Sequence, residues 1–237
     1  METKFYPYLL PIRCLIFLLI FIIASFITEK NLDEISNIWS IVASVVNIAI
    51  ILLLVFITRK NGGYKKLINY EKGKSTPKQI TKMIFIILFL GMGGMYLAGF
   101  LCYGVIPYFA PMMIAPIPLW IAIINILILP ISTALAEDGL YLGCGVNQIK
   151  NKYIAIFVPA FFFALQHSFI PTLFDVRYIV YRFLSFLPLT ILLCMHYHKH
   201  RNPLPIIIGH ALIDVFTVAW ILITSAIPDF YEMMLNM

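Results

Sequence analysis

Residues 41–57 read IVASVVNIAIILLLVFI, a run without a charged side chain. Ser44 and Asn47 are its only polar residues, and its apolar residues stand at consecutive positions. A strand of a membrane barrel would instead alternate apolar and polar residues. Because a helix needs about 20 mainly apolar residues to cross a bilayer, this run and its flanks predict a transmembrane α-helix.

The rest of the chain has the same apolar character. Of its 237 residues, 62% are hydrophobic and only 12% are charged, against roughly a quarter charged in a soluble globular domain. So few charged side chains cannot cover a soluble globule, which excludes a water-soluble fold. The sequence predicts an all-α, polytopic transmembrane helix bundle of about seven spans. The predicted spans are residues 9–28, 36–58, 83–105, 116–145, 153–170, 179–197 and 203–226.

The distribution of Lys and Arg predicts how the bundle lies in the membrane. The connection 59–82 holds eight basic residues and a single acidic one, Glu71. Because loops rich in Lys and Arg stay in the cytoplasm, we expect this connection and the N-terminus to be cytoplasmic, in an integral multi-pass protein of the cell membrane. We divide the chain into residues 1–82, with two helices and the basic loop, and residues 83–237, with a five-helix bundle.

Neither a nucleic acid partner nor a disulfide framework is indicated. The net charge of +6 comes from basic residues between the spans, and no RNA-binding motif accompanies them. The four cysteines stand singly in apolar stretches without a CxxC pair, so we expect buried thiols. The partner that the composition does indicate is the lipid bilayer.

The candidate site residues are ionisable side chains within otherwise apolar spans, namely Glu137, Asp138, His167, His210 and Asp214. A charged group at the centre of a membrane helix costs about 2.5 to 3.5 kcal/mol, so these side chains should face the interior of the bundle. His210 and Asp214 share a helical face because they are four residues apart. The neighbours Glu137 and Asp138 diverge by about 100°, so we expect one to react and the other to support it.

Each of these residues alone has an ordinary explanation. A lone histidine can join two helices by a hydrogen bond, and Asp214 can simply pair with His210. Two histidines and three acids on three membrane helices are better explained together, as a functional site. A transporter is less well supported, because no pair of interrupted helices in an inverted repeat is visible.

The order of these residues resembles that of the CPBP family, which contains CAAX prenyl endopeptidases, bacteriocin-processing proteins and their Abi relatives. The family pattern is EExxxR, then FxxxH, then HxxxN or HxxxD. This chain has EDGLYL at residues 137–142, then Phe163 to His167, then His210 to Asp214. The resemblance covers about residues 130–220 and implies a membrane-embedded endopeptidase of the CPBP or CAAX type.

The resemblance also implies roles for individual residues. The implied catalytic residues are Glu137, His167, His210 and Asp214, with Asp138 and Phe163 in support. The first two would hold and deprotonate a water, and the next two would steady the oxyanion. The substrate would be a peptide or small protein, which is prenylated in one branch of the family and a bacteriocin or leader peptide in another.

One departure from the family pattern bears on activity. Leu142 stands where the family has its arginine, so Asp138 lacks the expected cation. Arg182 is the nearest alternative in sequence, but its position in its span places it nearer the outer face. The departure supports a second hypothesis, in which the chain is a catalytically impaired, Abi-like immunity or scaffold protein that binds a peptide partner.

The same residue types leave the cofactor open. Two histidines and a carboxylate with a bound water form a standard zinc site, and the ligands here would be Glu137, His167 and His210. No HExxH motif is present. We favour a mechanism without a metal, in which the glutamate activates the water directly, and keep a divalent metal such as zinc as the alternative.

Overall fold

The structure is a computed structural model that describes residues 3–106, 108 and 110–235. Its regular elements over these residues are helices, apart from one isolated bridge between Phe169 and Thr172. The all-α prediction is therefore confirmed for the described part of the chain. The long helices are α1 (Ile12–Thr28), α3 (Trp39–Thr58), α5 (Pro77–Tyr103), α6 (Leu119–Glu137), α7 (Lys152–His167), α8 (Val176–His200) and α9 (Leu204–Ala226).

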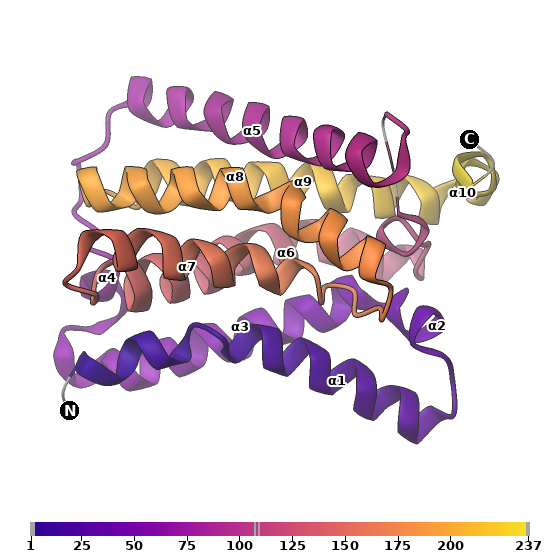
Figure 1. The fold of residues 1–237 in the computed structure, drawn as a ribbon, viewed down its shortest axis with the longest axis horizontal. Helices are drawn as coiled ribbons and strands as arrows, with labels where there is room; N and C mark the ends of the chain where they lie inside the picture. The colour runs from indigo at the N-terminus through magenta and orange to yellow at the C-terminus, as the bar shows by residue number, and fades with distance from the viewer. Residues whose placement is uncertain (1–2, 107, 109, 236–237) are drawn as a thin grey trace.

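Shorter elements link the long helices. They are η1 (Thr3–Leu9), α2 (Leu32–Ser36), η2 (Arg59–Asn61), α4 (Gly63–Leu67), η3 (Pro111–Met113), η4 (Asp138–Val146) and α10 (Pro228–Leu235). Most are single turns, but η4 is a π-helix that continues α6 without a break. The long helices run side by side along the molecule, with α4 at one end and with α2 and α10 at the other (Figure 1).

Six of the helices are long and apolar enough to cross a membrane, which supports an integral multi-pass protein. Within the described residues, length and composition support six of the seven predicted spans, and the stretch 153–170 is the exception. That stretch forms α7, which is apolar but ends at His167 after 16 residues. The chain then runs through an irregular segment before α8 begins, so α7 is shorter than the other membrane helices.

Capping groups explain where several helices begin. The Thr76 side chain accepts a hydrogen bond from the Gln79 amide, and the Gln79 side chain bonds back to the Thr76 amide. With Pro77 at the first helical position, this capping box starts α5 before the apolar run at residue 83. The Asn151 and Asp175 side chains cap the N-termini of α7 and α8 by accepting hydrogen bonds from backbone amides of the first turn.

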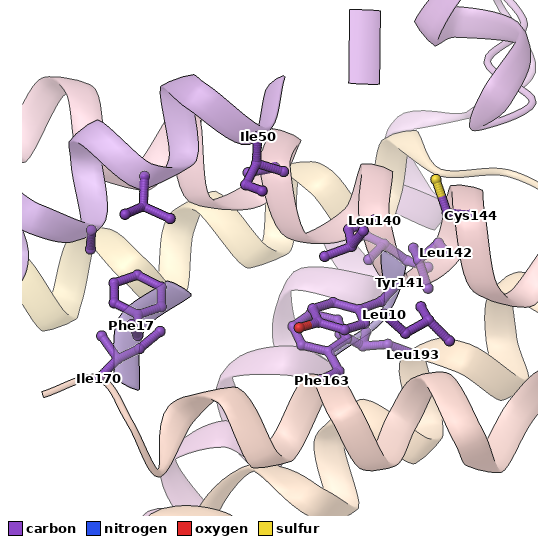
Figure 2. Packing of buried hydrophobic residues seen from close by; sticks show 14 of the residues in the cluster. Leu10, Phe17, Ile50, Leu140, Tyr141, Leu142, Cys144, Phe163, Ile170 and Leu193 are labelled. Carbon is purple, nitrogen blue, oxygen red and sulfur yellow. The ribbon is translucent and has the colours of Figure 1, made fainter. Parts of the chain in front are cut away.

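The helices pack into one continuous core. Helix α6 lies against α3 and α9, while α8 lies against α5 and α7. At Gly94 the backbones of α5 and α8 approach so closely that a Cβ would lie 2.4 Å from the Ser185 carbonyl oxygen. Buried side chains from the turn after η1, from η4 and from α8, among them Leu10, Leu142 and Leu193, meet beside the π-helix (Figure 2).

Single polar residues inside the spans join helices. Asn125 Oδ1 accepts a hydrogen bond of 2.8 Å from Ser44 Oγ, which links α6 to α3. The four cysteines are free, and Cys14, Cys144 and Cys194 are buried. The expectation of buried thiols therefore holds for three of them, whereas Cys102 is half-buried.

Candidate active site

The acidic pair lies where α6 changes from an α-helix to a π-helix. Glu137 is the last residue of α6 and Asp138 is the first residue of η4. Their exposed fractions are 1% and 0%, so both carboxyl groups are inside the bundle as predicted. Segments of π-helix are rare and occur often at functional sites, because they turn side chains away from the positions that an α-helix gives them.

His167 is the last residue of α7, and its ring is held from two sides. Its Nδ1 lies 2.8 Å from the Phe163 carbonyl oxygen, and the ring stacks on Phe186 with centroids 3.6 Å apart. A carbonyl oxygen can only accept, so Nδ1 carries the proton and Nε2 of the neutral ring carries the lone pair. That Nε2 lies 3.9 Å from Glu137 Oε2. Phe163 thus supports the histidine through its backbone as well as through its ring.

His210, on α9, lies among three carboxyl groups. Its Nδ1 is 3.2 Å from Asp138 Oδ1, while its Nε2 is 3.6 Å from Glu137 Oε2. The same Nε2 is 3.7 Å from Asp214 Oδ2, one turn further along α9. The neighbouring acids therefore contact opposite nitrogens of one ring, in agreement with the expectation that they cannot both aim at one atom.

The four predicted catalytic residues come together from α6, α7 and α9. Glu137 Oε2 and Asp214 Oδ2 are buried and accept no hydrogen bond from any described residue. The separation of 3.9 Å between Glu137 Oε2 and His167 Nε2 is too long for a hydrogen bond. One water molecule could bridge the two atoms, because its oxygen can donate to both.

Arg13 is a site residue that the sequence analysis missed. It lies on α1 with an exposed fraction of 1%, and its Nη2 donates a 2.8 Å hydrogen bond to Glu137 Oε1. Its Nε donates to Gln166 Oε1 at 2.6 Å, and its Nη1 donates to Asn47 Oδ1. Arg13 falls inside the predicted span 9–28, so the rule that flags ionisable residues within spans would have included it.

Leu142 is fully buried in the hydrophobic core, where no charged group could be accommodated cheaply (Figure 2). The cation of the site comes from α1 instead, and it pairs with Glu137 rather than with Asp138. Asp138 is paired with His210.

Arg182 lies beside the site but does not pair with Asp138. Its Nε donates to the His167 carbonyl oxygen and its Nη2 to the Ile170 carbonyl oxygen, each at 3.2 Å. The guanidinium also lies over the ring of Phe186, 4.9 Å from the centroid. Arg182 therefore holds the C-terminal end of α7, which carries His167.

A cavity of about 230 Å³ opens onto the site. Glu137, His167 and Asp214 line it, and Arg13 and Arg182 contribute to its wall. Most of the remaining lining is methionine, aromatic or aliphatic, including Trp39 and Trp220.

The fit of a metal ion can be judged from the donor atoms. Among the residues that the structure describes, no group of three or more His, Cys, Asp or Glu side chains is arranged to hold one. The zinc alternative would use Glu137, yet the Arg13 guanidinium occupies its Oε1 at 2.8 Å. A fixed positive charge at that distance opposes the binding of a second cation to the same carboxylate.

The fold and the site define a class of protein: a helical membrane bundle in which acids and histidines gather beside a cavity. Residues 118–216 match the family described as Rce1-like, type II CAAX prenyl endopeptidase Rce1-like. This match, over less than half of the chain, agrees with the resemblance to the CPBP family of membrane peptidases. No curated protein and no solved structure matches the chain. The matched segment contains all four predicted catalytic residues, whereas Arg13 lies outside it.

Proposed function

We propose that the chain is an intramembrane endopeptidase that hydrolyses a peptide bond with a water held between Glu137 and His167. The observation that carries the proposal is the pair of facing acceptors, Glu137 Oε2 and His167 Nε2, which are 3.9 Å apart on residues that line the cavity. Two acceptors at this spacing can bind both hydrogens of one water, which directs an oxygen lone pair toward an incoming carbonyl carbon.

The chemistry then follows from the two carboxylate oxygens of Glu137. Arg13 holds Oε1, which fixes the plane of the carboxylate and leaves Oε2 to accept a proton from the water. The water oxygen bonds to the carbonyl carbon as the proton moves to Oε2, and the C–N bond breaks when that proton passes to the leaving nitrogen. Arg13 is a positioning residue in this scheme, because it acts through Glu137.

His210 is suited to stabilise the oxyanion. Asp138 accepts a hydrogen bond from Nδ1, and the acids around the ring favour an imidazolium that can also donate from Nε2. Asp214 contacts the same Nε2, so we assign it to orienting the ring rather than to binding the oxyanion directly. An ionised Asp214 would repel an oxyanion at that position.

We favour a reaction in which no metal takes part, with zinc on Glu137, His167 and His210 as the alternative. The Arg13 guanidinium beside Glu137 supports this preference. Activity of the purified protein should persist in the presence of a strong chelator, and metal analysis should find less than one zinc per chain. Stoichiometric zinc whose removal abolishes cleavage would contradict the preference.

The substrate of the proposed enzyme is a peptide or small protein, either prenylated or of the bacteriocin or leader type. We further propose that the N-terminus is cytoplasmic and that the protein resides in the cell membrane, because the connection 59–82 is strongly basic. Candidate substrates for a first assay are a farnesylated C-terminal peptide and a bacteriocin leader peptide, each reconstituted with the protein in lipid vesicles.

The direct test is Glu137→Gln, which keeps the shape of the side chain and removes the base. We expect the cleavage rate to fall by a factor of about 10² to 10⁴. Glu71→Gln is the matched control, because the Glu71 side chain is 65% exposed on the basic connection. Cleavage by Glu137→Gln at the rate of the unaltered chain would remove the proposed base.

A second candidate function is a non-catalytic immunity or scaffold protein that binds a peptide partner in the same cavity. The apolar Leu142 at the position of the family's arginine favours it. The test is a variant in which Glu137, His167 and His210 are all replaced by alanine. If this variant inserts into the membrane and still protects cells against a toxic peptide, the binding role is supported. Loss of protection in that variant would favour catalysis.

A further inference from the structure

Arg182 is a buried cation without an acidic partner among the residues that the structure describes. Its exposed fraction is 4%, and it lies on α8, one of the six helices long enough to span a membrane. Among the described residues, no carboxylate forms an ion pair with it. A charged side chain inside a membrane protein is costly, and such residues usually pair with an opposite charge or serve a ligand.

The three carboxylates of the proposed active site contact residues other than Arg182. Glu137 pairs with Arg13, Asp138 pairs with His210, and Asp214 lies against the other nitrogen of His210. The hydrogen-bond partners of Arg182 are two neutral carbonyl groups at the end of α7. They orient the guanidinium but leave its charge uncompensated.

The side chain that carries this uncompensated charge forms part of the cavity wall. Arg182 lines this cavity together with Glu137, His167 and Asp214. Its Nε and Nη2 bond to carbonyls, and no described residue accepts a hydrogen bond from its Nη1. A guanidinium presents its donors as a planar fork, which matches the two oxygens of a carboxylate.

We propose that Arg182 forms a binding site for a carboxylate of the peptide substrate within this cavity. This inference rests on the proposed peptidase function and names the chemical group that the cavity selects. The carboxylate could be the C-terminus of the peptide or the side chain of an Asp or Glu. Both present the same two oxygens to the guanidinium, and the remaining lining of the cavity favours apolar side chains around them.

The test compares the binding of three short apolar peptides to the full-length chain carrying Glu137→Gln, so that no peptide is consumed. The peptides are acetyl-Leu-Leu-Leu with a free carboxyl terminus, the same peptide as its C-terminal amide, and acetyl-Leu-Asp-Leu as its amide. Binding is measured by calorimetry in detergent micelles. The first two peptides differ only in the terminal charge, and the third places the charge on a side chain.

We expect one of the two charged peptides to bind about tenfold or more tightly than the uncharged amide. The charged peptide that binds more tightly than the amide shows whether the carboxylate comes from the C-terminus or from a side chain. Arg182→Gln should abolish the difference, whereas Arg177→Gln should preserve it. Arg177 is an exposed arginine on the same helix, over the ring of Tyr103, and so makes a matched control.

Equal binding of all three peptides would overturn the proposal, and so would a preference that survives Arg182→Gln. Failure of every peptide to bind up to about 1 mM would also count against it. If Arg182→Gln does not fold, Arg182→Lys replaces it, because lysine keeps the charge without the fork. The preference should then fall severalfold, and an unchanged preference contradicts the proposal.

These outcomes are separate from those of the catalytic proposal. If Glu137→Gln cleaved a substrate normally, the proposed base would be wrong while the binding preference at Arg182 could still be measured. If the binding preference were absent, the loss of cleavage in Glu137→Gln would be unaffected.

Discussion

Two buried arginines flank the proposed site, and their surroundings differ. Arg13 on α1 donates hydrogen bonds to a carboxylate and to two side-chain amide oxygens. Arg182 on α8 donates to two backbone carbonyls and lies over an aromatic ring. The difference separates two uses of a cation inside a membrane protein. Arg13 is the counterion of a residue that belongs to the chain, whereas the proposed partner of Arg182 is a group that enters the cavity.

The two arginines also differ in where they come from. Arg182 lies within the segment 118–216 that matches the peptidase family, and Arg13 lies outside it. The site is therefore not contained in the matched segment. The remainder of the chain supplies the group that contacts the proposed base.

The largest expected effect is that of Arg13→Gln. Removing one partner of a buried ion pair should lower the free energy of unfolding by about 3–5 kcal/mol, because the Glu137 carboxylate is left without its counterion. Thermal unfolding in detergent measures this change. Arg59→Gln, at an exposed arginine, is the control and should be nearly neutral.

A double variant sharpens the same prediction. Arg13→Gln combined with Glu137→Gln leaves two neutral amides, so the unfolding free energy should recover relative to Arg13→Gln alone. Arg13→Lys, which keeps the charge, should retain part of the catalytic rate with KM little changed. A stable Arg13→Gln chain that cleaves its substrate at the normal rate would refute the pairing.

A smaller effect is expected for Asp138→Asn. The substitution weakens the acceptor for His210 Nδ1 without changing the size of the side chain. The catalytic rate should fall about 10- to 100-fold, as for other groups that orient a catalytic histidine. Substrate binding should change little. A variant with full activity would show that Asp138 does not orient His210.

The smallest of these effects is expected for the stability of Arg182→Gln. Two hydrogen bonds from a charged group to carbonyls are lost, but no carboxylate is left unpaired. We expect a loss of about 1–3 kcal/mol in unfolding free energy, below that of Arg13→Gln. An equal or larger loss would show that Arg182 has a structural role as demanding as that of Arg13.

Much of the fold and part of the site can be predicted from the free-energy cost of placing polar and charged groups in a bilayer. Long uncharged runs predict helices, and the expense of an ionisable group in a bilayer predicts that Glu137, His167 and His210 face one another. The structure brings these residues together. The π-helix η4, which the sequence analysis does not predict, continues α6 as far as Val146, and Glu137 Oε2 lies 3.6 Å from His210 Nε2.

Arg13 shows why the rest of the site could not be predicted. A positive residue near the end of a predicted span looks like a signal of membrane orientation, and nothing local links it to an acid more than a hundred positions later. The family motif leads one to expect the arginine in the turn after the acidic pair, where this chain has Leu142. Only packing reveals that α1 lies beside α6 and α7 at that level.

The position of Arg13 on the first helix has a consequence for the biogenesis of the protein. The ribosome makes α1 long before Glu137 and Gln166 emerge, so a cation enters the membrane before the residues that neutralise it. Assembly is complete only when the earliest helix has met two of the later ones. A shortened chain that kept every motif residue but began after α1 would carry the proposed catalytic glutamate without its counterion.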